Sequence, residues 1–465
     1  MQIERVYTPG LAQVAYLIGD EQAGVAAVID PRRDVAEYLA LAQQHGLRIT
    51  HVFETHVHAD FVSGALELAQ ATGAAVYTSR LGASEFLHTP IDDGDTIEVG
   101  SLCFTALFTP GHTPEHMAYL VTDPEISARP QSLFSGDMLF VGEVGRPDLL
   151  GESETAALVS QLFDSIRARL IPLDDDIIVY PGHGAGSACG KKIGDSSSTT
   201  IGQEKRFNYA FQISEREAFS AEIMAGMPPA PTYYPILKRV NKVGATPLKD
   251  LELGRPLSAD DVEARRADGA TVIDARAPEA FGGAHIPGAI FAGLGPNFTA
   301  WMGWLAPYEA DLILVLDHDD QFEEACTELR RIGLDRIAGY LQGGLASWVA
   351  SGRDIATLAQ ITVNELDERM KNDPTLRVLD VRSADEWNGG HIADAEHQYA
   401  GEIVGGTPHS NGVDTPEAGE LALICGSGYR SSVAASVLQR NGQTELLNVI
   451  GGMTAWQAAD LPTER

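Results

Sequence analysis

The sequence lacks the features that would place the chain in a membrane or outside the cell. No apolar run approaches the roughly 18 residues that a membrane-spanning helix needs. The opening MQIERVYTPG lacks the basic and then apolar pattern of a secretion signal. The 465 residues include only 4 cysteines and no CxxC pair, which excludes a disulfide framework and a zinc knuckle. We therefore expect a cytoplasmic protein with free thiols.

Basic tracts are absent as well. The chain has 33 Lys and Arg against 65 Asp and Glu, a net charge of −32 that repels polyanions and argues against nucleic-acid binding. An anionic small-molecule substrate therefore needs a local basic pocket. Candidates that stand near the motifs described below are Arg146, Lys191, Lys192, Lys205 and Arg206. Ordinary solvated surface charge is the alternative interpretation for each of them.

The length and the distribution of prolines indicate several domains. A chain of 465 residues exceeds what a single hydrophobic core supports. Strand-like and helix-like runs alternate over the first 120 residues, with a helix expected from Val35 to His45. The stretch MPPAPTYYP at 227–235 is typical of a rigid, extended linker. We place the first domain at residues 1–245.

An internal repeat fills the rest of the chain. TVIDARAPEAFGGAHIPGA at 271–289 matches RVLDVRSADEWNGGHIADA at 377–395, and LQGGLASW at 341–348 matches VIGGMTAW at 449–456. The two offsets, 106 and 108, differ by only two residues. We therefore expect two homologous α/β domains, at residues 250–355 and 360–465. The repeated histidines, His285 and His391, are interpreted as fold-maintaining.

Histidine and aspartate recur in the first domain where strand-like runs meet loops. Alternate residues at the end of a strand can face one cavity, which suits a metal site. The four junctions contribute His56, His58 and Asp60, then His112, then Asp137, then His183.

This order of HxHxD, Gly-His-Thr, Gly-Asp and Pro-Gly-His resembles the metallo-β-lactamase superfamily over about 240 residues. The resemblance implies an αββα sandwich, so the fold class is α/β multidomain, with that sandwich followed by the two α/β domains. Dinuclear members place a histidine directly after the Asp, where this chain has Phe61. Phenylalanine cannot ligate a metal, so we expect a mononuclear site.

Two histidines and one carboxylate form the ligand set of non-haem Fe(II) oxygenases, and His56, His112 and Asp137 can supply it. The superfamily's persulfide dioxygenases use these three positions, and the whole chain resembles members of that group fused to rhodanese domains. The resemblance implies one Fe(II) per chain, with zinc as the alternative. It makes His58, Asp60 and His183 groups that support the ligands. His58 stays open as a fourth ligand.

A thiol loop follows a buried strand in the last domain. Its residues are Cys425, Gly426, Ser427, Gly428, Tyr429 and Arg430. We expect the loop amides and the following helix N-terminus to favour the Cys425 thiolate, the catalytic nucleophile, and Arg430 to attract sulfite or thiosulfate. This CxxGxR loop resembles an active rhodanese. The middle domain has Asp317-His318-Asp319-Asp320 instead, so we interpret it as an inactive rhodanese that serves as a spacer or docking surface.

The resemblance implies an enzyme of hydrogen sulfide detoxification. It oxidises a glutathione-type or coenzyme A-type persulfide with O₂ to sulfite and thiol, and transfers sulfur between persulfide, sulfite and thiosulfate. Arg146, Lys191 and Lys192 would hold the carrier's carboxylates, and a homo-oligomer is expected. The rivals are a zinc thioesterase of glyoxalase II type and a non-enzymatic sulfur carrier. The carrier, the direction of sulfur transfer and the role of Cys189 stay open.

Overall fold

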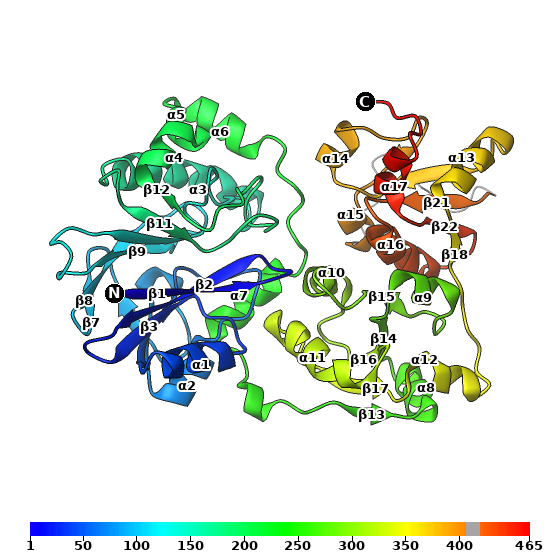
Figure 1. The fold of residues 1–465 in the computed structure, drawn as a ribbon, viewed down its shortest axis with the longest axis horizontal. Coiled ribbons are helices and arrows are strands. Elements are labelled where there is room, and N and C mark those ends of the chain that lie inside the picture. The colour runs from blue at the N-terminus through cyan, green and yellow to red at the C-terminus, as the bar shows by residue number, and fades with distance from the viewer. Residues whose placement is uncertain (406–418) are drawn as a thin grey trace. The chain divides into compact units, whose positions relative to one another are not determined.

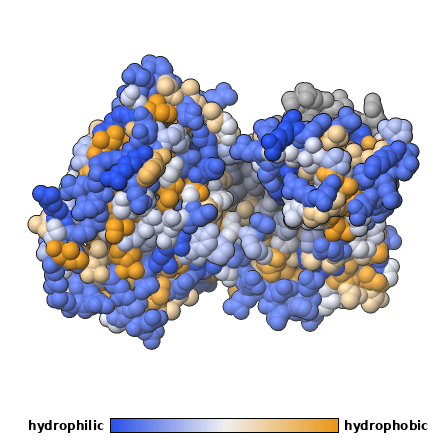
Figure 2. All heavy atoms as spheres, turned by 45° about the horizontal axis from the view of Figure 1, so that its top comes forward, coloured by the Kyte–Doolittle hydropathy of each residue, from blue (hydrophilic) through white to orange (hydrophobic). Residues whose placement is uncertain are grey.

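The computed structural model describes residues 1–405 and 419–465 and divides into two compact units (Figure 1). The first comprises Met1–Leu251 with Arg330–Gly333, and the second comprises Glu252–Leu329 and Leu334–Arg465. Within the described residues, no helix is both long and apolar enough to cross a membrane. Blue, hydrophilic residues dominate the face of the molecule in Figure 2, and apolar ones are scattered among them.

Two six-stranded sheets form the first unit. The first sheet runs in sequence order and contains β1 (Gln2–Thr8), β2 (Gln13–Asp20), β3 (Val25–Ile29), β4 (Arg48–Phe53), β5 (Ala75–Ser79) and β6 (Thr89–Ile91). The second contains β7 (Thr96–Val99), β8 (Leu102–Phe108), β9 (Met117–Thr122), β10 (Ser132–Gly136), β11 (Ile178–Pro181) and β12 (Thr199–Thr200).

The period-2 alternation of strand β2 shows how these sheets are packed. Val14, Tyr16 and Ile18 point into the core between the two sheets, where aromatic rings from both sheets meet. Ala15 and Leu17 point the other way, into a core formed with the helices on the outer face. Both faces of β2 are therefore buried, which explains its continuous apolar sequence.

Helices cover the outer face of each sheet. The first sheet carries α1 (Ala36–Gln44) and α2 (Ala65–Thr72), and the second carries α3 (Glu152–Ser165), α4 (Ile201–Phe207), α5 (Tyr209–Gln212) and α6 (Arg216–Met224). A π-helical turn at Ile166–Leu170 extends α3. This helix-sheet-sheet-helix order confirms the predicted αββα sandwich.

The proline-rich stretch at 227–235 is only partly the extended linker that the sequence predicted. Its last two residues, Tyr234 and Pro235, begin helix α7 (Tyr234–Val243), which packs on the first unit. A proline in the first helical turn removes an N–H that has no partner inside the helix, so it favours a helix start as readily as a linker.

Two five-stranded parallel sheets with the same topology form the second unit, which confirms two α/β domains after the sandwich. One sheet has the order β13 (Arg255–Leu257), β17 (Ile337–Leu341), β16 (Leu312–Val315), β14 (Thr271–Asp274) and β15 (Ile290–Phe291). The other has the order β18 (Ala359–Ile361), β22 (Leu446–Val449), β21 (Leu421–Ile424), β19 (Arg377–Asp380) and β20 (Glu396–His397).

Helices connect these parallel strands. The first sheet is joined by α8 (Ala259–Ala267), α9 (Pro278–Gly283), α10 (Phe298–Leu305), α11 (Phe322–Arg331) and α12 (Gly344–Ala350). The second is joined by α13 (Val363–Asn372), α14 (Ala384–Asn388), α15 (Ala400–Val404), α16 (Tyr429–Arg440) and α17 (Gly452–Ala458).

The repeated histidines make the same contacts in both domains. The His285 ring stacks on Phe281 at 3.9 Å between centroids, and its Nδ1 bonds to the Phe281 carbonyl at 2.8 Å. His391 stacks on Trp387 at 3.6 Å and bonds to its carbonyl at 3.1 Å. Because the contacts occur with and without a thiol loop, they support the fold rather than the chemistry.

Candidate metal centre and thiol loop

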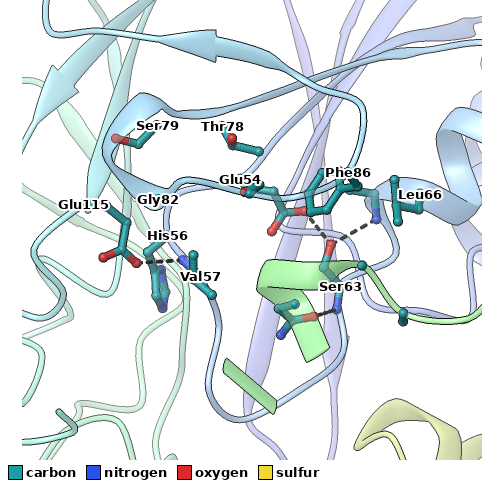
Figure 3. Close-up of a pocket in the computed structure, with 15 residues that line it drawn as sticks. Glu54, His56, Val57, Ser63, Leu66, Thr78, Ser79, Gly82, Phe86 and Glu115 are labelled. Carbon is teal, nitrogen blue, oxygen red and sulfur yellow. Dashed lines mark hydrogen bonds between the residues drawn. The ribbon is translucent and has the colours of Figure 1, made fainter. Parts of the chain in front are cut away.

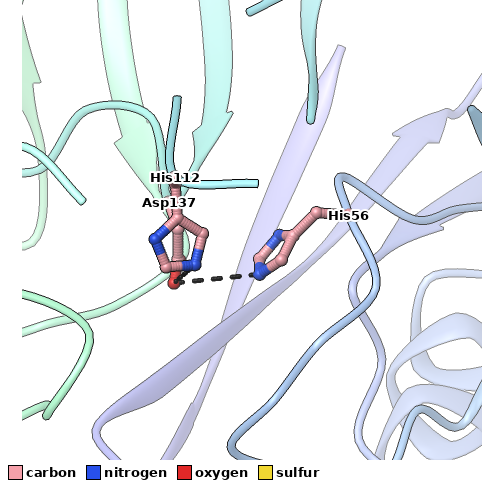
Figure 4. A group of neighbouring side chains, drawn as sticks. All are labelled: His56, His112 and Asp137. Atoms are coloured by element: carbon pink, nitrogen blue, oxygen red, sulfur yellow. Dashed lines mark ion pairs between the residues drawn. The ribbon is translucent and has the colours of Figure 1, made fainter. Parts of the chain in front are cut away.

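Two imidazoles and one carboxylate converge where three loops of the first unit meet (Figure 4). His56 follows β4, His112 lies between β8 and β9, and Asp137 follows β10. The Asp137 Oδ2 atom lies 3.5 Å from His112 Nε2 and 3.9 Å from His56 Nε2. One ligand atom from each residue lies within 4.8 Å of the other two, and all three side chains are buried. The structure thus brings together the three residues that the sequence proposed as ligands.

Neighbouring groups orient these three side chains. His112 Nδ1 donates to the Arg146 carbonyl at 2.9 Å, so its Nε2 carries the lone pair when the ring is neutral. His56 Nδ1 lies 2.9 Å from Thr55 Oγ1, and the other Asp137 oxygen, Oδ1, lies 2.8 Å from His183 Nδ1. Asp137 Oδ2 is buried without a hydrogen-bond partner. A buried acceptor facing two ring nitrogens fits a bound cation.

The protonation states agree with this assignment. Burial, followed by the neighbouring imidazoles, holds the pKa of His56 well below its ordinary value, and burial also lowers the pKa of His112. Both rings are therefore neutral, the form that ligates metals. Burial by itself raises the pKa of Asp137, but the charge and hydrogen bond of His183 outweigh burial and lower it. Asp137 is therefore an ionised carboxylate.

His58 belongs to a second buried cluster. Its Nε2 lies 3.1 Å from both Asp30 Oδ1 and Glu54 Oε2. Burial opposes its ionisation, but these two carboxylates raise the pKa of His58 well above its ordinary value. Its Nδ1 is buried without a hydrogen-bond partner, and its ring centroid lies 4.2 Å from that of His56. His58 thus connects His56 to buried acidic groups, and its supporting role stays a prediction.

Asp60 and His183 lie in a third cluster. His183 Nε2 lies 2.7 Å from Asp60 Oδ2, so this ring bridges Asp60 and Asp137. Cys189 offers its sulfur to the same cluster and lies 3.8 Å from the Tyr234 hydroxyl. Burial, then the nearby Asp60, raises the pKa of Cys189 well above its ordinary value, so its thiol stays protonated. Asp60 and His183 are placed to support Asp137.

The expectation that His56, His58 and Asp60 can face one cavity stays a prediction. They enter three different clusters, with His112 and Asp137, with Asp30 and Glu54, and with His183 and Cys189. Strand β4 ends at Phe53, so these residues lie in an irregular loop. The period-2 alternation of a strand does not extend into a loop.

Phe61 fills the place where dinuclear relatives of the superfamily carry a histidine. Its ring is fully buried, 4.3 Å from the His58 ring. We predict that Phe61→His, by adding an imidazole beside Asp60 and His183, raises bound zinc from about one to about two ions per chain. Elemental analysis of zinc-loaded protein measures this ratio, with Phe61→Leu as the matched control. An unchanged ratio in the histidine variant would contradict the role assigned to Phe61.

A cavity reaches His56 from one side (Figure 3). Glu54 and Glu115 contribute carboxylates to its wall, and Phe86 and Leu66 contribute apolar surface. Among the described residues that line this cavity, none is a lysine or an arginine. The approach to His56 from this side is therefore acidic.

The proposed carrier-binding cations are largely occupied within the domain. Arg146 is only 1% exposed, and its guanidinium donates to Asp148 at 2.7 Å and to the carbonyls of Ala188 and Pro228. These contacts tie Arg146 to the neighbouring loops, and its role in binding the carrier stays a prediction. Lys191 donates to the carbonyls of Glu222 and Ala225. Lys192 is exposed and stays a predicted binding residue.

Sequence reasoning missed His116, which lies within the Gly-His-Thr motif region. Its Nε2 accepts from the Asp137 backbone N–H at 3.1 Å, and its Nδ1 lies 2.9 Å from Thr109 Oγ1. Burial lowers the pKa of His116 to about 3, so the ring is neutral. It fixes the backbone of Asp137. Its place in FTPGHTPEH was the only signal for it in the sequence.

The thiol loop of the second unit lies between β21 and α16. Cys425 is buried, and its sulfur accepts from the Gly428 backbone N–H at 3.1 Å and lies 3.5 Å from Ser431 Oγ. Gly428 has a φ of 105°, which side chains other than glycine's rarely tolerate. The amides of Met453 and Thr454 donate to the carbonyls of Cys425 and Gly426, so α17 supports the loop from below.

Arg430 lies beside the loop in an ion pair with Glu386. Its two terminal nitrogens donate to the two Glu386 oxygens at 2.6 and 2.7 Å. Burial by itself raises the pKa of Glu386, but Arg430 outweighs burial and lowers this pKa to about 2. An incoming anion would have to share the guanidinium with Glu386. The anion-binding role of Arg430 stays a prediction, as do those of Gly426 and Ser427.

The middle domain contacts the thiol loop through its own backbone. The Tyr429 hydroxyl donates to the Gly293 carbonyl at 2.9 Å, and Phe291 packs edge-on against the Tyr429 ring at 5.4 Å. The Phe291 amide donates to Ser436 Oγ at 3.1 Å. Because Tyr429 is held by the middle domain, it fixes the start of α16, and its predicted role in binding substrate stays untested.

The acidic loop of the middle domain is used for structure. Asp319 accepts from the Gly343 amide at 3.1 Å, and Asp317 and Asp320 are exposed. The position corresponding to Cys425 has no thiol. The middle domain therefore has the same fold as the last domain but lacks the cysteine nucleophile.

The fold, the candidate metal centre and the thiol loop together define the class of protein. The chain belongs to the metallo-β-lactamase superfamily and has two rhodanese-like domains after its first domain. The Metallo-beta-lactamase superfamily matches residues 8–183, and the Rhodanese-like domain matches 258–351 and 362–459.

Relatives with different functions match this chain. The hydroxyacylglutathione hydrolase GloC of Haemophilus influenzae is 31% identical over 230 residues, which are 45% of this chain and 97% of GloC. The mitochondrial persulfide dioxygenase ETHE1 of Homo sapiens is 30% identical over 184 residues, 39% of this chain and 67% of ETHE1. A solved metallo-beta-lactamase from Staphylococcus aureus is 34% identical with a TM-score of 0.66, and the match covers 73% of this chain and 98% of that one.

Proposed function

We propose that this protein oxidises a low-molecular-weight persulfide with O₂ to sulfite and the free thiol, and that Cys425 then transfers sulfane sulfur. The observation that carries the proposal is the convergence of His56, His112 and Asp137, two neutral imidazoles and one carboxylate, as the candidate ligand set. The similarity to persulfide dioxygenase ETHE1 and the fused rhodanese-like domains support it.

The reaction balances as R–S–SH + O₂ + H₂O → R–SH + SO₃²⁻ + 2 H⁺. Iron(II), the metal that we assign to the three ligands, supplies the activation of O₂ when it is bound. The protein contributes fixed ligands and a buried surrounding. Thr55 and the Arg146 carbonyl orient the two imidazoles, while His183 and the His116 ring hold Asp137 in place. This preorganisation keeps the ligand set from rearranging during turnover.

The sulfite then accepts sulfur at the thiol loop. The substrate persulfide loads Cys425, R–S–SH + Cys–SH → R–SH + Cys–S–SH. The Cys425 persulfide then transfers its outer sulfur, Cys–S–SH + SO₃²⁻ → Cys–SH + S₂O₃²⁻, or the reverse of this second reaction loads Cys425 from thiosulfate. The Gly428 amide and the Ser431 hydroxyl next to the sulfur stabilise a negative charge on it. Joining both activities in one chain raises the local concentration of the shared product.

Oxygen consumption tests the proposal. Anaerobically iron-loaded protein receives glutathione persulfide and then O₂, and sulfite and thiosulfate are quantified. We expect one O₂ consumed for each persulfide sulfur that is oxidised. Coenzyme A persulfide, tried in parallel, identifies the carrier. If none of the persulfides tested causes O₂ uptake, the dioxygenase proposal is wrong.

A thioester hydrolase is the second candidate, because GloC, a hydroxyacylglutathione hydrolase, aligns over 97% of its length. Asp60 and His183 could bind a second metal ion and so favour the hydrolase. Phe61, which cannot ligate a metal, argues against the hydrolase. Zinc-loaded protein that hydrolyses S-lactoylglutathione without any O₂ uptake would establish this alternative in place of the dioxygenase.

A further inference from the structure

Helix α7 turns one face toward the candidate metal centre. Tyr234, Lys238 and Asn241 stand four and three residues apart, so they share that face. Asn241 Nδ2 donates to the carbonyls of His58 and Phe61 at 2.9 and 2.7 Å. The Tyr234 hydroxyl lies 3.8 Å from Cys189 Sγ. Lys238 lies between two residues that contact the surroundings of the centre, so its side chain is directed to the same region.

The ammonium of Lys238 is not neutralised by a direct contact. Within the part of the chain that the structure describes, no ion pair or hydrogen bond engages it, although Glu115 is close enough to act on it electrostatically. Burial lowers the pKa of Lys238, and Glu115 opposes this effect. Glu115 in turn accepts from the Val57 backbone N–H at 3.0 Å, next to His56 in the chain. Lys238 therefore lies close to the loop that carries this candidate ligand.

Lys238 is also accessible from solvent. It lines an open depression together with Leu149, Leu150, Tyr234 and Asp148, whose carboxylate is already paired with Arg146. The cavity that reaches His56 is lined by Glu54 and Glu115 and by no described lysine or arginine. The depression at Lys238 is therefore the more favourable approach for an anionic substrate. The apolar side chains around Lys238 strengthen its attraction for an anion by reducing the local dielectric constant.

A cation near the centre favours the binding of a persulfide anion. Five buried carboxyl groups surround the centre, those of Asp30, Glu54, Asp60, Glu115 and Asp137. A persulfide S–H is more acidic than the parent thiol, so the substrate carries a negative charge near neutral pH. The raised pKa values of His58 and His183 keep both rings protonated, so these rings and a bound divalent ion offset most of the carboxylate charge, and Lys238 adds a further positive charge.

We propose that Lys238 binds the negative charge of the persulfide and positions its terminal sulfur at the centre formed by His56, His112 and Asp137. This inference rests on the proposed dioxygenase function and gives Lys238 a positioning role in it. The reacting sulfur group of the substrate should then carry a negative charge, because the ammonium of Lys238 forms no ion pair with a neutral disulfide or thioester.

The test compares Lys238→Gln with Arg239→Gln, which removes an equal charge from an exposed residue of the same helix. For iron-loaded, full-length Lys238→Gln we expect the KM for glutathione persulfide to rise about tenfold and kcat to change less than about threefold. Arg239→Gln should match the wild type, and Lys238→Arg should restore most of the loss. High salt should reduce the difference between Lys238→Gln and the wild type.

A binding measurement without turnover separates the two proposals. Calorimetric titration of the full-length protein with glutathione persulfide under argon should give a Kd that rises by a similar factor in Lys238→Gln alone. An unchanged Kd and KM would overturn the role of Lys238 while leaving the dioxygenase intact. No O₂ uptake by the wild type would overturn the dioxygenase, and the Kd comparison would still decide on Lys238. If Lys238→Gln loses thermal stability, Lys238→Met replaces it in the comparison.

Discussion

Asp137→Asn should reduce persulfide-dependent O₂ uptake by about 1,000-fold or more, because Asp137 is the only carboxylate in the candidate ligand set. An amide has nearly the same shape but no charge, so it binds a divalent ion much more weakly. Iron affinity should fall by at least about 100-fold, more than the loss typical of a group that only supports a ligand. Oxygen-electrode assays and iron analysis of the same preparations measure both effects.

Glu143→Gln provides a comparison for Asp137→Asn. Glu143 is also buried in the first unit, but its carboxylate pairs with Tyr209 at 2.6 Å and is not in a candidate metal cluster. Its substitution should leave iron content unchanged. Sulfur transfer by Cys425, assayed with thiosulfate and cyanide, should survive in Asp137→Asn, because that step needs no metal. Full iron content and full O₂ uptake in Asp137→Asn would rule out the proposed ligand set.

Cys425→Ser should abolish sulfur transfer and leave O₂ uptake intact. A serine hydroxyl cannot form a persulfide, so we expect the thiosulfate–cyanide rate to fall by about 1,000-fold or more. With glutathione persulfide as substrate, the product should change from thiosulfate in the wild type to sulfite in the variant. Ion chromatography of the two anions at matched O₂ consumption measures this change.

Cys103→Ser is the matched control, because Cys103 lies in β8 and belongs to neither candidate site. It should keep both activities. Thiosulfate production by Cys425→Ser at the wild-type rate would place sulfur transfer at another thiol. Loss of O₂ uptake in this variant would show that the thiol loop takes part in the oxidation as well.

The fold and the proximity of His56, His112 and Asp137 could be predicted from sequence motifs and from their resemblance to the metallo-β-lactamase superfamily. Each candidate ligand follows an apolar, strand-like run, and such runs bring loop residues to one edge of a sheet. The repeat at 271–289 and 377–395 marked two similar domains without reference to any structure. These signals depend only on residues that are close in the sequence.

The pairing of charges could not be predicted in this way. Arg146 is paired with its near neighbour Asp148, whereas Lys238, which Arg239 follows in the sequence, has no direct ion pair within the described residues. The sequence does not show that the Arg146 guanidinium also donates to the Pro228 carbonyl, 82 residues away. It likewise gave no signal for the position of Lys238 on the face of α7 that it shares with Tyr234 and Asn241.

The contact between Tyr429 and the Gly293 carbonyl gives the middle domain a share in holding the loop that carries Cys425. Because Gly293 contributes a backbone atom, many substitutions in the middle domain can accumulate without breaking that contact, and this freedom is compatible with the absence of a thiol from its own loop. A chain cut near residue 358 would lack this hydrogen bond to the first residue of helix α16.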